Sequence, residues 1–247
     1  MRQRAGAQDR LEVVTIDGPA GAGKSTVSRQ VAGQLGFRFL NTGLFYRGVA
    51  WRAAQMGEGT TAFDWLEGLS LRVDSSVPAP DGAMRDDDPV YIRTAEGERE
   101  IPASELKGDG VKARLSQVAA DLQVRQFLLP LQRNCAKDGP LVVEGRDTGS
   151  VVFPDAAHKF FLVASLERRA ERRHSEELER AANGGAKATD VASLLCEIAK
   201  RDSIDYSREH APLRRPEDAV YVDSSDMTRA EVVDHLIRRV KGEGGAA

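Results

Sequence analysis

The chain contains the stretch Gly18-Pro19-Ala20-Gly21-Ala22-Gly23-Lys24-Ser25-Thr26, which decides the fold. It fits the pattern G-x-x-x-x-G-K-[ST], a glycine-rich loop that holds phosphate groups. The run before it, 12–17, is short and apolar and predicts a buried strand. The run after it, 26–35, has apolar residues at helical spacing. A strand, a glycine loop and a helix in this order are the context that the pattern needs.

The residue types of this loop fit the binding of a triphosphate. Glycines let backbone N–H groups approach phosphate oxygens, and the start of the helix adds partial positive charge there. We expect Lys24 to contact the β- and γ-phosphates and the hydroxyl of Ser25 to hold Mg²⁺. A glycine-rich turn without a ligand is the alternative, and Lys-Ser after the last glycine argues against it. The loop indicates the phosphate donor and leaves the acceptor open.

Composition and length set limits on the rest. With 247 residues, 41% hydrophobic and 30% charged, the chain suits one large domain or a core with a smaller insert. A net charge of −3 argues against nucleic acid as a partner. Cys135 and Cys196 show no metal-site spacing, and no secretory signal or membrane-spanning run is present, so we expect a cytoplasmic protein. We also expect a monomer, with loosely ordered ends at 1–10 and 242–247.

Strands and helices alternate along most of the chain. Short apolar runs at 37–40, 141–143, 158–163 and 219–222 predict further strands, and helical patterns lie between them. This alternation predicts an α/β fold with a central parallel sheet flanked by helices. The expected core consists of residues 11–62, 109–165 and 209–241.

Two segments depart from this alternation. Residues 63–108 contain short alternating runs and many turn residues, which predict a small antiparallel insert. A long structureless loop is the alternative, but such loops are uncommon in compact domains. Residues 166–208 contain a charged helix, a glycine-rich break at 183–186 and a second helix. A mobile helical lid would have this pattern, and so would a solvated helix with its own ion pairs.

Arginines supply the positive charge that phosphoryl transfer requires around the transferring phosphate. Arg47, Arg146 and the arginines of 168–173 could converge on it, although an arginine on a helix is most often simply solvated. Arg146 and Asp147 directly follow the predicted strand 141–143. The carboxyl end of a parallel strand is where ligands bind in such sheets.

Several stretches together resemble the bacterial cytidylate kinase family. Besides the loop, they are Asn41-Thr42-Gly43-Leu44-Phe45-Tyr46-Arg47 and Glu144-Gly145-Arg146-Asp147-Thr148-Gly149-Ser150-Val151-Val152-Phe153-Pro154-Asp155-Ala156. In addition, Arg201-Asp202-Ser203-Ile204-Asp205-Tyr206-Ser207-Arg208 is similar to the family's R-D-x-x-D-x-x-R stretch. The resemblance runs from about residue 12 to about residue 240.

The resemblance implies a P-loop kinase fold of the nucleoside monophosphate kinase type, with a core, a mobile lid and an insert in the monophosphate-binding part. It implies transfer of the γ-phosphate of ATP to CMP or dCMP with Mg²⁺. It implies that the acceptor phosphate is held by Arg47, Arg146 and Arg208, that cytosine is read by Ser116, Arg125 and Asp147, and that the sugar is contacted by Asp205 with Arg201. The expected substrate site also includes Thr42 and Tyr46, and the expected catalytic residues are Lys24, Arg146, Arg169 and Arg173.

The roles assigned to the base-reading residues agree with the chemistry of cytosine. Cytosine presents an N4 amino donor beside acceptors at N3 and O2, so Asp147 can accept from N4 while Arg125 or Ser116 donates to N3 or O2. Uracil has an acceptor in place of that donor, so the carboxylate should reject it. No general base is required, because a phosphate oxygen of CMP is already a nucleophile and positioning suffices.

The sequence also departs from the family. It has Ile101-Pro102-Ala103 where the family commonly has Ile-Arg-Thr, so an arginine expected near the acceptor is absent, and Arg99 or Arg93 could replace it. Asn41 stands where a carboxylate is usual. Glu144 is a conservative change that could hold Mg²⁺ through water or could be a buried acid at the end of a strand.

Other functions fit the loop less well. One is a P-loop kinase for UMP, another nucleoside monophosphate or a metabolite such as shikimate, although a metabolite kinase needs no base-reading residues. Another is a nucleotide-binding switch. A guanine-binding switch should contain Asn/Thr-Lys-x-Asp, and the sequence has no such stretch.

Overall fold

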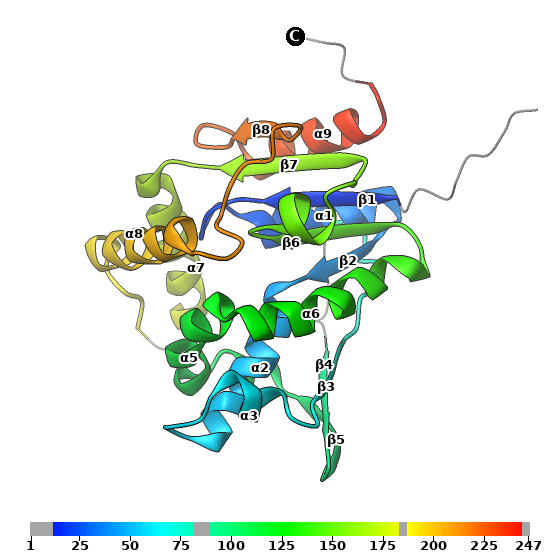
Figure 1. Cartoon of the computed structure of the whole chain (residues 1–247). Helices are drawn as coiled ribbons and strands as arrows, with labels where there is room; N and C mark the ends of the chain where they lie inside the picture. The colour runs from blue at the N-terminus through cyan, green and yellow to red at the C-terminus, as the bar shows by residue number, and fades with distance from the viewer. Residues whose placement is uncertain (1–11, 82–88, 183–186, 244–247) are drawn as a thin grey trace, which may run out of the picture.

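The computed structural model describes residues 12–81, 89–182 and 187–243. Within these ranges, five strands form a parallel sheet in the order β2-β6-β1-β7-β8. This arrangement confirms the predicted α/β fold with a central parallel sheet (Figure 1). The strands are β1 (Val13–Asp17), β2 (Arg38–Asn41), β6 (Leu141–Gly145), β7 (His158–Val163) and β8 (Val220–Asp223).

The central strand β1 alternates its side chains between two hydrophobic cores. Val13 packs in one core and Val14 in the other, since successive side chains of a strand point to opposite faces. Both residues are buried, as expected for a strand with neighbours on both sides and helices on both faces. The pairing of Asp17 with Gly145 and of Asn41 with Glu144 brings the carboxyl ends of β1, β2 and β6 together.

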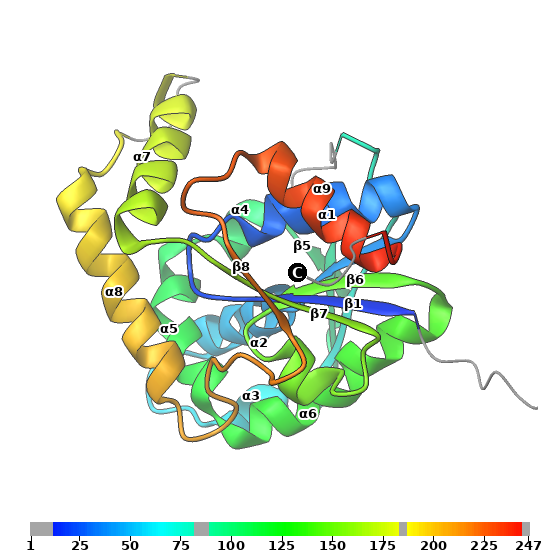
Figure 2. The ribbon, with the colours of Figure 1, turned by 90° about the horizontal axis from the view of Figure 1, so that it is seen from above.

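Helices cover both faces of this sheet. Val31 of α1 and Leu236 of α9 belong to the core on one face, and Leu44 of α2 and Leu128 of α6 belong to the core on the other. Figure 2 shows α1 and α9 on one side of the strands and α2 and α6 on the other. The helices concerned are α1 (Lys24–Leu35), α2 (Gly43–Met56), α5 (Asp109–Ala120), α6 (Leu122–Asn134) and α9 (Arg229–Val240).

A second, antiparallel sheet in the described part of the chain contains β3 (Ser70–Val73), β4 (Val90–Thr94) and β5 (Gly97–Ile101) in that order. The predicted antiparallel insert is therefore confirmed in its strands. Leu71 and Ile92 pack in the same core as α2, so the described residues of this small sheet share a core with the main sheet. Two short helices flank it, α3 (Ala62–Leu66) and α4 (Ala103–Leu106).

The two helices of the predicted lid lie side by side at one edge of the molecule. They are α7 (Leu166–Ala182) and α8 (Val191–Ser207), joined through a small core of Ala170, Leu194 and Ile198 (Figures 1 and 2). The break predicted at 183–186 lies outside the described residues, as do the chain ends at 1–10 and 244–247. Across the ranges that are described, the helices are all too short or too polar to cross a bilayer.

Candidate active site

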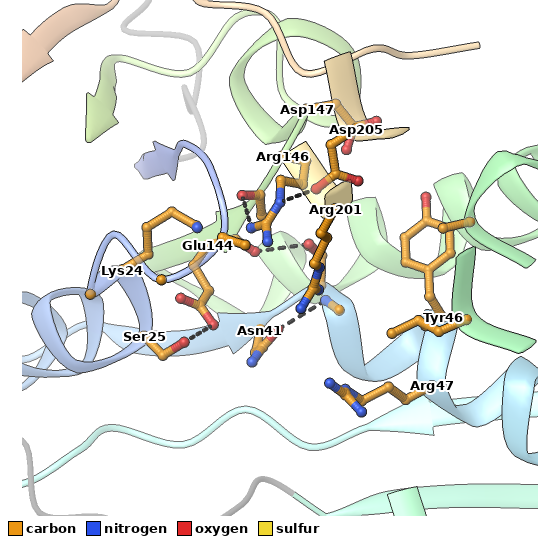
Figure 3. Close-up of a pocket in the computed structure, with 18 of the residues that line it drawn as sticks. Lys24, Ser25, Asn41, Tyr46, Arg47, Glu144, Arg146, Asp147, Arg201 and Asp205 are labelled. Atoms are coloured by element: carbon orange, nitrogen blue, oxygen red, sulfur yellow. Dashed lines mark hydrogen bonds and ion pairs between the residues drawn. The ribbon is translucent and has the colours of Figure 1, made fainter. Parts of the chain in front are cut away.

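A cavity of about 400 Å³ opens at the carboxyl ends of β1, β2 and β6. Most of its walls come from the four stretches on which the functional prediction was based: the loop 18–26, the segment 41–47, the segment 144–147 and the end of α8 at 201–208. Residues of α5, α6 and α7 complete the lining. Figure 3 shows side chains from these stretches converging on one space. Segments that lie more than 100 residues apart along the chain therefore form one polar site.

The glycine loop adopts a backbone conformation that its glycines make possible. Gly23, the residue before α1, has a φ of +82°, in the left-handed region that other residues rarely adopt. At Gly18, a Cβ would lie 1.9 Å from the carbonyl oxygen of Leu162 on β7. The loop thus passes directly against the sheet, and Gly21 and Gly23 line the cavity.

Lys24 is folded back onto its own loop. Its Nζ donates a hydrogen bond of 2.7 Å to the carbonyl oxygen of Pro19, and the side chain is buried. Burial lowers the pKa of Lys24 well below its ordinary value, the charge of Arg146 lowers it further, and Glu144 opposes these effects. An anion bound at the loop would relieve the repulsion and favour the charged ammonium.

Ser25 and Glu144 form the part of the cavity suited to a cation. The Ser25 hydroxyl donates a hydrogen bond of 2.7 Å to Oε1 of Glu144, as Figure 3 shows. The other oxygen, Oε2, is buried and has no hydrogen-bond partner among the described residues. Burial raises the pKa of Glu144, while Lys24 and Ser25 act in the opposite direction. A hydroxyl beside an unpaired carboxylate oxygen fits Mg²⁺, which prefers oxygen ligands.

The described residues contain no cluster of three or more histidine, cysteine, aspartate or glutamate side chains that could enclose a metal ion. Mg²⁺ usually keeps several waters and binds through one or two protein groups together with substrate phosphates. The pair of Ser25 and Glu144 fits this mode of binding.

Arginines line the side of the cavity opposite the glycine loop. Nε of Arg146 donates a hydrogen bond of 2.9 Å to Oδ2 of Asp205, and Nη2 of Arg208 lies 3.5 Å from Oδ1 of the same carboxylate. Arg201 also faces this space (Figure 3). Burial and the nearby charge of Arg146 lower the pKa of Arg201 to about 10, with Asp205 opposing. Such crowding of buried positive groups favours an anionic ligand.

Arg125 and Asp147 form a buried ion pair at the far end of the cavity. The guanidinium of Arg125 also lies over the ring of Tyr46, 5.4 Å from its centre. Burial raises the pKa of Asp147, and the charge of Arg125 is the largest opposing effect. The carboxylate of Asp147 is a hydrogen-bond acceptor and the guanidinium of Arg125 is a donor, and both lie near the ring of Tyr46. A flat ligand with a donor next to an acceptor would match this arrangement.

Outside the glycine loop, two of the predicted site residues lie away from the cavity. From α5, the described residues that line it are Leu115 and Ala119, whereas Ser116 is exposed on that helix. Arg169 is buried beneath the glycine loop, where its guanidinium donates to Ala20, Ala164 and Asp202. This placement gives no support to direct contact of Arg169 with a reacting phosphate. Arg173, in contrast, lines the cavity.

The arginine absent at Pro102 is not replaced by its neighbours. Arg99 pairs with Glu105 at 2.5 Å, Arg93 pairs with Glu98 at 2.5 Å, and within the described ranges neither arginine lines the cavity. Pro102 itself begins the short helix α4 as its N-cap.

Asp17, a buried acid at the end of β1, is not among the predicted site residues. It accepts hydrogen bonds from N and Oγ1 of Thr148, at 2.9 and 2.8 Å, and from N of Gly149, at 2.7 Å. Burial raises the pKa of Asp17 to about 6, although these hydrogen bonds oppose the shift. Asp17 therefore anchors the turn η2 (Thr148–Val152) directly after Asp147. An aspartate that ends an apolar strand was the available signal in the sequence.

A parallel sheet, a phosphate-binding loop at its carboxyl edge and a facing cluster of arginines define a P-loop phosphotransferase. Comparison with known proteins gives the family: the model of the cytidylate kinase family, described as "Cytidylate kinase", matches residues 14–242. The chain belongs to the cytidylate kinase family, as the sequence motifs predicted.

Curated relatives from several bacteria agree with this assignment, and each bears the name cytidylate kinase. The chain is 38% identical to the protein of an Exiguobacterium species over 235 residues, 92% of this chain and 97% of the relative. It is 42% identical to that of Mycobacterium avium over 226 residues, 91% and 92% of the two chains. It is 40% identical to that of Geobacter sulfurreducens over 224 residues, 91% and 90% of the two chains.

Proposed function

We propose that this chain transfers the γ-phosphate of ATP to CMP or dCMP, giving ADP and CDP or dCDP. Membership of the cytidylate kinase family supports the activity. The observation that carries the proposal is that the glycine loop and the pair of Arg125 and Asp147 open into the same cavity, with arginines between them. This order supports a donor site at the loop, an acceptor-phosphate site at the arginines and a base site at Arg125 and Asp147.

The donor half of the site is the glycine loop with Lys24 and Ser25. Backbone N–H groups and Lys24 would bind the β- and γ-phosphates, and Lys24 would leave the carbonyl of Pro19 to do so. Ser25 would hold Mg²⁺, with Glu144 behind it as a direct or water-mediated ligand. When bound, the ion would neutralise charge on the phosphates as the γ-phosphoryl group leaves.

The acceptor half is the arginine cluster around Asp205. Arg47, Arg146 and Arg208 would hold the phosphate of CMP, and Arg201 with Asp205 would contact the sugar. The repulsion among these arginines would be relieved by the acceptor phosphate, which is a dianion. Reaction would then need only the positioning of one phosphate oxygen in line with the γ-phosphate of ATP, together with neutralisation of charge.

The cytosine ring would lie beside Tyr46, at the pair of Asp147 and Arg125. The carboxylate of Asp147 would accept from N4, and Arg125 would donate to N3 or O2. UMP would place an acceptor against the buried carboxylate, and the unpaired groups would disfavour it. A role for Ser116 in reading the base remains a prediction, because this residue is exposed on α5.

A coupled ADP-release assay with ATP and Mg²⁺ tests this function. The acceptors are CMP, dCMP, UMP, AMP, GMP and shikimate. We expect the highest kcat/KM with CMP or dCMP. Faster turnover with another acceptor would support the alternative kinase functions, and ADP release that no acceptor stimulates would support a nucleotide-binding switch.

Some expectations from the sequence stay proposals. They are the division into a core, an insert at 63–108 and a mobile lid at 166–208, a monomeric and cytoplasmic enzyme, and the lack of a nucleic-acid partner. Size-exclusion chromatography with light scattering tests the oligomeric state.

A further inference from the structure

Ala20 in the glycine loop is held by side chains from both helices of the predicted lid. Its N–H donates a hydrogen bond of 3.1 Å to Oδ1 of Asp202 on α8. Its carbonyl oxygen accepts a hydrogen bond of 2.8 Å from Nη1 of Arg169 on α7. Arg169 and Asp202 also pair with each other at 2.5 Å, so the two side chains and the peptide groups of Ala20 close a small network.

This network is buried and tightly packed. Asp202 is 8% exposed and Arg169 is 7% exposed, and Nε of Arg169 donates a further hydrogen bond of 3.0 Å to Ala164. Next to Ala20, a Cβ on Gly21 would lie 3.3 Å from the Cβ of Arg169, so the helix is in close contact with the loop. Charged side chains withdrawn from water in this way hold a defined geometry, because losing a partner would leave a buried charge unpaired.

The neighbours of Asp202 on α8 face the acceptor. Arg201 and Asp205 are four residues apart and line the cavity. Asp202 lies roughly 100° around the helix from Arg201 and roughly 60° from Asp205, and its side chain contacts the donor loop. The same helical turn therefore contacts the loop with one side chain and the acceptor side with two others. A shift of the peptide groups of Ala20 on triphosphate binding has to be accommodated by this turn.

We propose that Asp202 is a positioning residue that couples the donor loop to the acceptor residues Arg201 and Asp205. Asp202 touches neither substrate; it acts through Ala20 on one side and through the α8 backbone on the other. ATP bound at the loop would thereby fix Arg201 and Asp205 in the orientation that binds the acceptor. This inference rests on the proposed function, because it takes CMP as the ligand of the arginine cluster.

Binding measurements on the full-length protein separate coupling from mere stability. Isothermal titration calorimetry gives the Kd of CMP without and with a saturating, non-hydrolysable ATP analogue and Mg²⁺. We expect the analogue to tighten CMP binding by about fivefold or more in the unaltered protein, which is within the range typical of coupled sites. In Asp202→Asn, which keeps the size of the side chain and removes its charge, we expect the ratio of the two Kd values to approach one.

A second variant and a control complete the test. Arg169→Lys keeps the positive charge but cannot reach Ala20, Ala164 and Asp202 together, so it should also reduce the ratio, and it provides the test if Asp202→Asn does not fold. Glu171→Gln removes an exposed ion pair with Arg168 on the same lid and should leave the ratio unchanged. The proposal is overturned if the unaltered protein shows no coupling, or if folded variants keep it. Failure of CMP to bind the unaltered protein at all would instead contradict the proposed function.

Discussion

Asp205 on α8 accepts a hydrogen bond of 2.9 Å from Nε of Arg146, which follows β6 at the edge of the sheet. The same carboxylate lies 3.5 Å from Nη2 of Arg208. An arginine that follows the carboxyl end of β6 and an arginine at the end of α8 thus lie beside one carboxylate. With both guanidinium groups placed in this way, an acceptor phosphate would meet a preformed pair of donors.

We expect Asp205→Asn to weaken the acceptor site selectively. The amide retains one acceptor oxygen but loses the charge that holds Arg146 and Arg208. Hydrogen bonds to charged groups contribute about 1.5–3 kcal/mol, so the KM for CMP should rise by about 10–100-fold. Steady-state kinetics with each substrate varied in turn would show this rise, with the KM for ATP little changed. An equal rise in both KM values would mean that Asp205 supports the whole cavity and not the acceptor alone.

Asp147→Asn should reduce discrimination between CMP and UMP. An asparagine side chain can turn its amide N–H₂ toward O4 of uracil, so the repulsion of a buried carboxylate disappears. We expect the ratio of kcat/KM for CMP and UMP to fall by about 100-fold. The control is Asp138→Asn, which alters an ion pair of 3.5 Å with Arg38 outside the cavity lining. If the ratio is the same in the unaltered enzyme and in Asp147→Asn, then Asp147 does not read the base.

Glu144→Gln should weaken the response to Mg²⁺. The buried Oε2 and its neighbour Ser25 are the protein groups assigned to the ion, and an amide is a poorer partner for a divalent cation than a carboxylate. Loss of such a partner typically weakens metal affinity by about 10–100-fold. The rate measured against free Mg²⁺ at fixed ATP should shift its midpoint upward. Glu98→Gln, in the exposed pair with Arg93, should not shift it.

The fold and the general place of the site could be predicted because both depend on local patterns. The glycine loop lies between an apolar run and a helical run, and the strand 141–143 ends in Glu144, so their meeting at one sheet edge follows from parallel pairing. Ser116 shows the limit of such reasoning. Leu115 lines the cavity while the adjacent Ser116 is exposed, and the rotation of a helix about its axis depends on tertiary packing.

Contacts between distant residues could not be predicted from the sequence. Asp17 meets Thr148 across 131 residues, and Asp202 meets Ala20 across 182 residues. An aspartate at the end of a strand or on a charged helix is ordinary in sequence. Its importance depends on which backbone groups the fold places opposite it, and a periodicity pattern contains no such information.

Asp17 should make stability depend on pH in a characteristic direction. Its pKa is raised from 3.8 to about 6, mainly by burial, so the folded protein binds more protons than the unfolded chain between these values. The contribution of Asp17 to the stability of the fold is therefore fully present below pH 3.8 and is lost as the pH rises through about 6. A shift of one pKa unit corresponds to 1.36 kcal/mol, so the free energy of unfolding should fall by about 3 kcal/mol as Asp17 loses its proton.

Urea unfolding of the unaltered protein and of Asp17→Asn, each at pH values from about 4 to about 7.5, isolates this effect from the other titrating groups, which both proteins share. Asp17→Asn will be less stable in absolute terms, because an amide cannot accept from both Thr148 and Gly149 with both of its atoms. The informative quantity is the difference in unfolding free energy, which we expect to shrink as the pH rises, since only the unaltered protein then acquires a buried charge. A difference that stays constant over this range would show that Asp17 keeps an ordinary pKa, and that its hydrogen bonds from the turn η2 outweigh its burial.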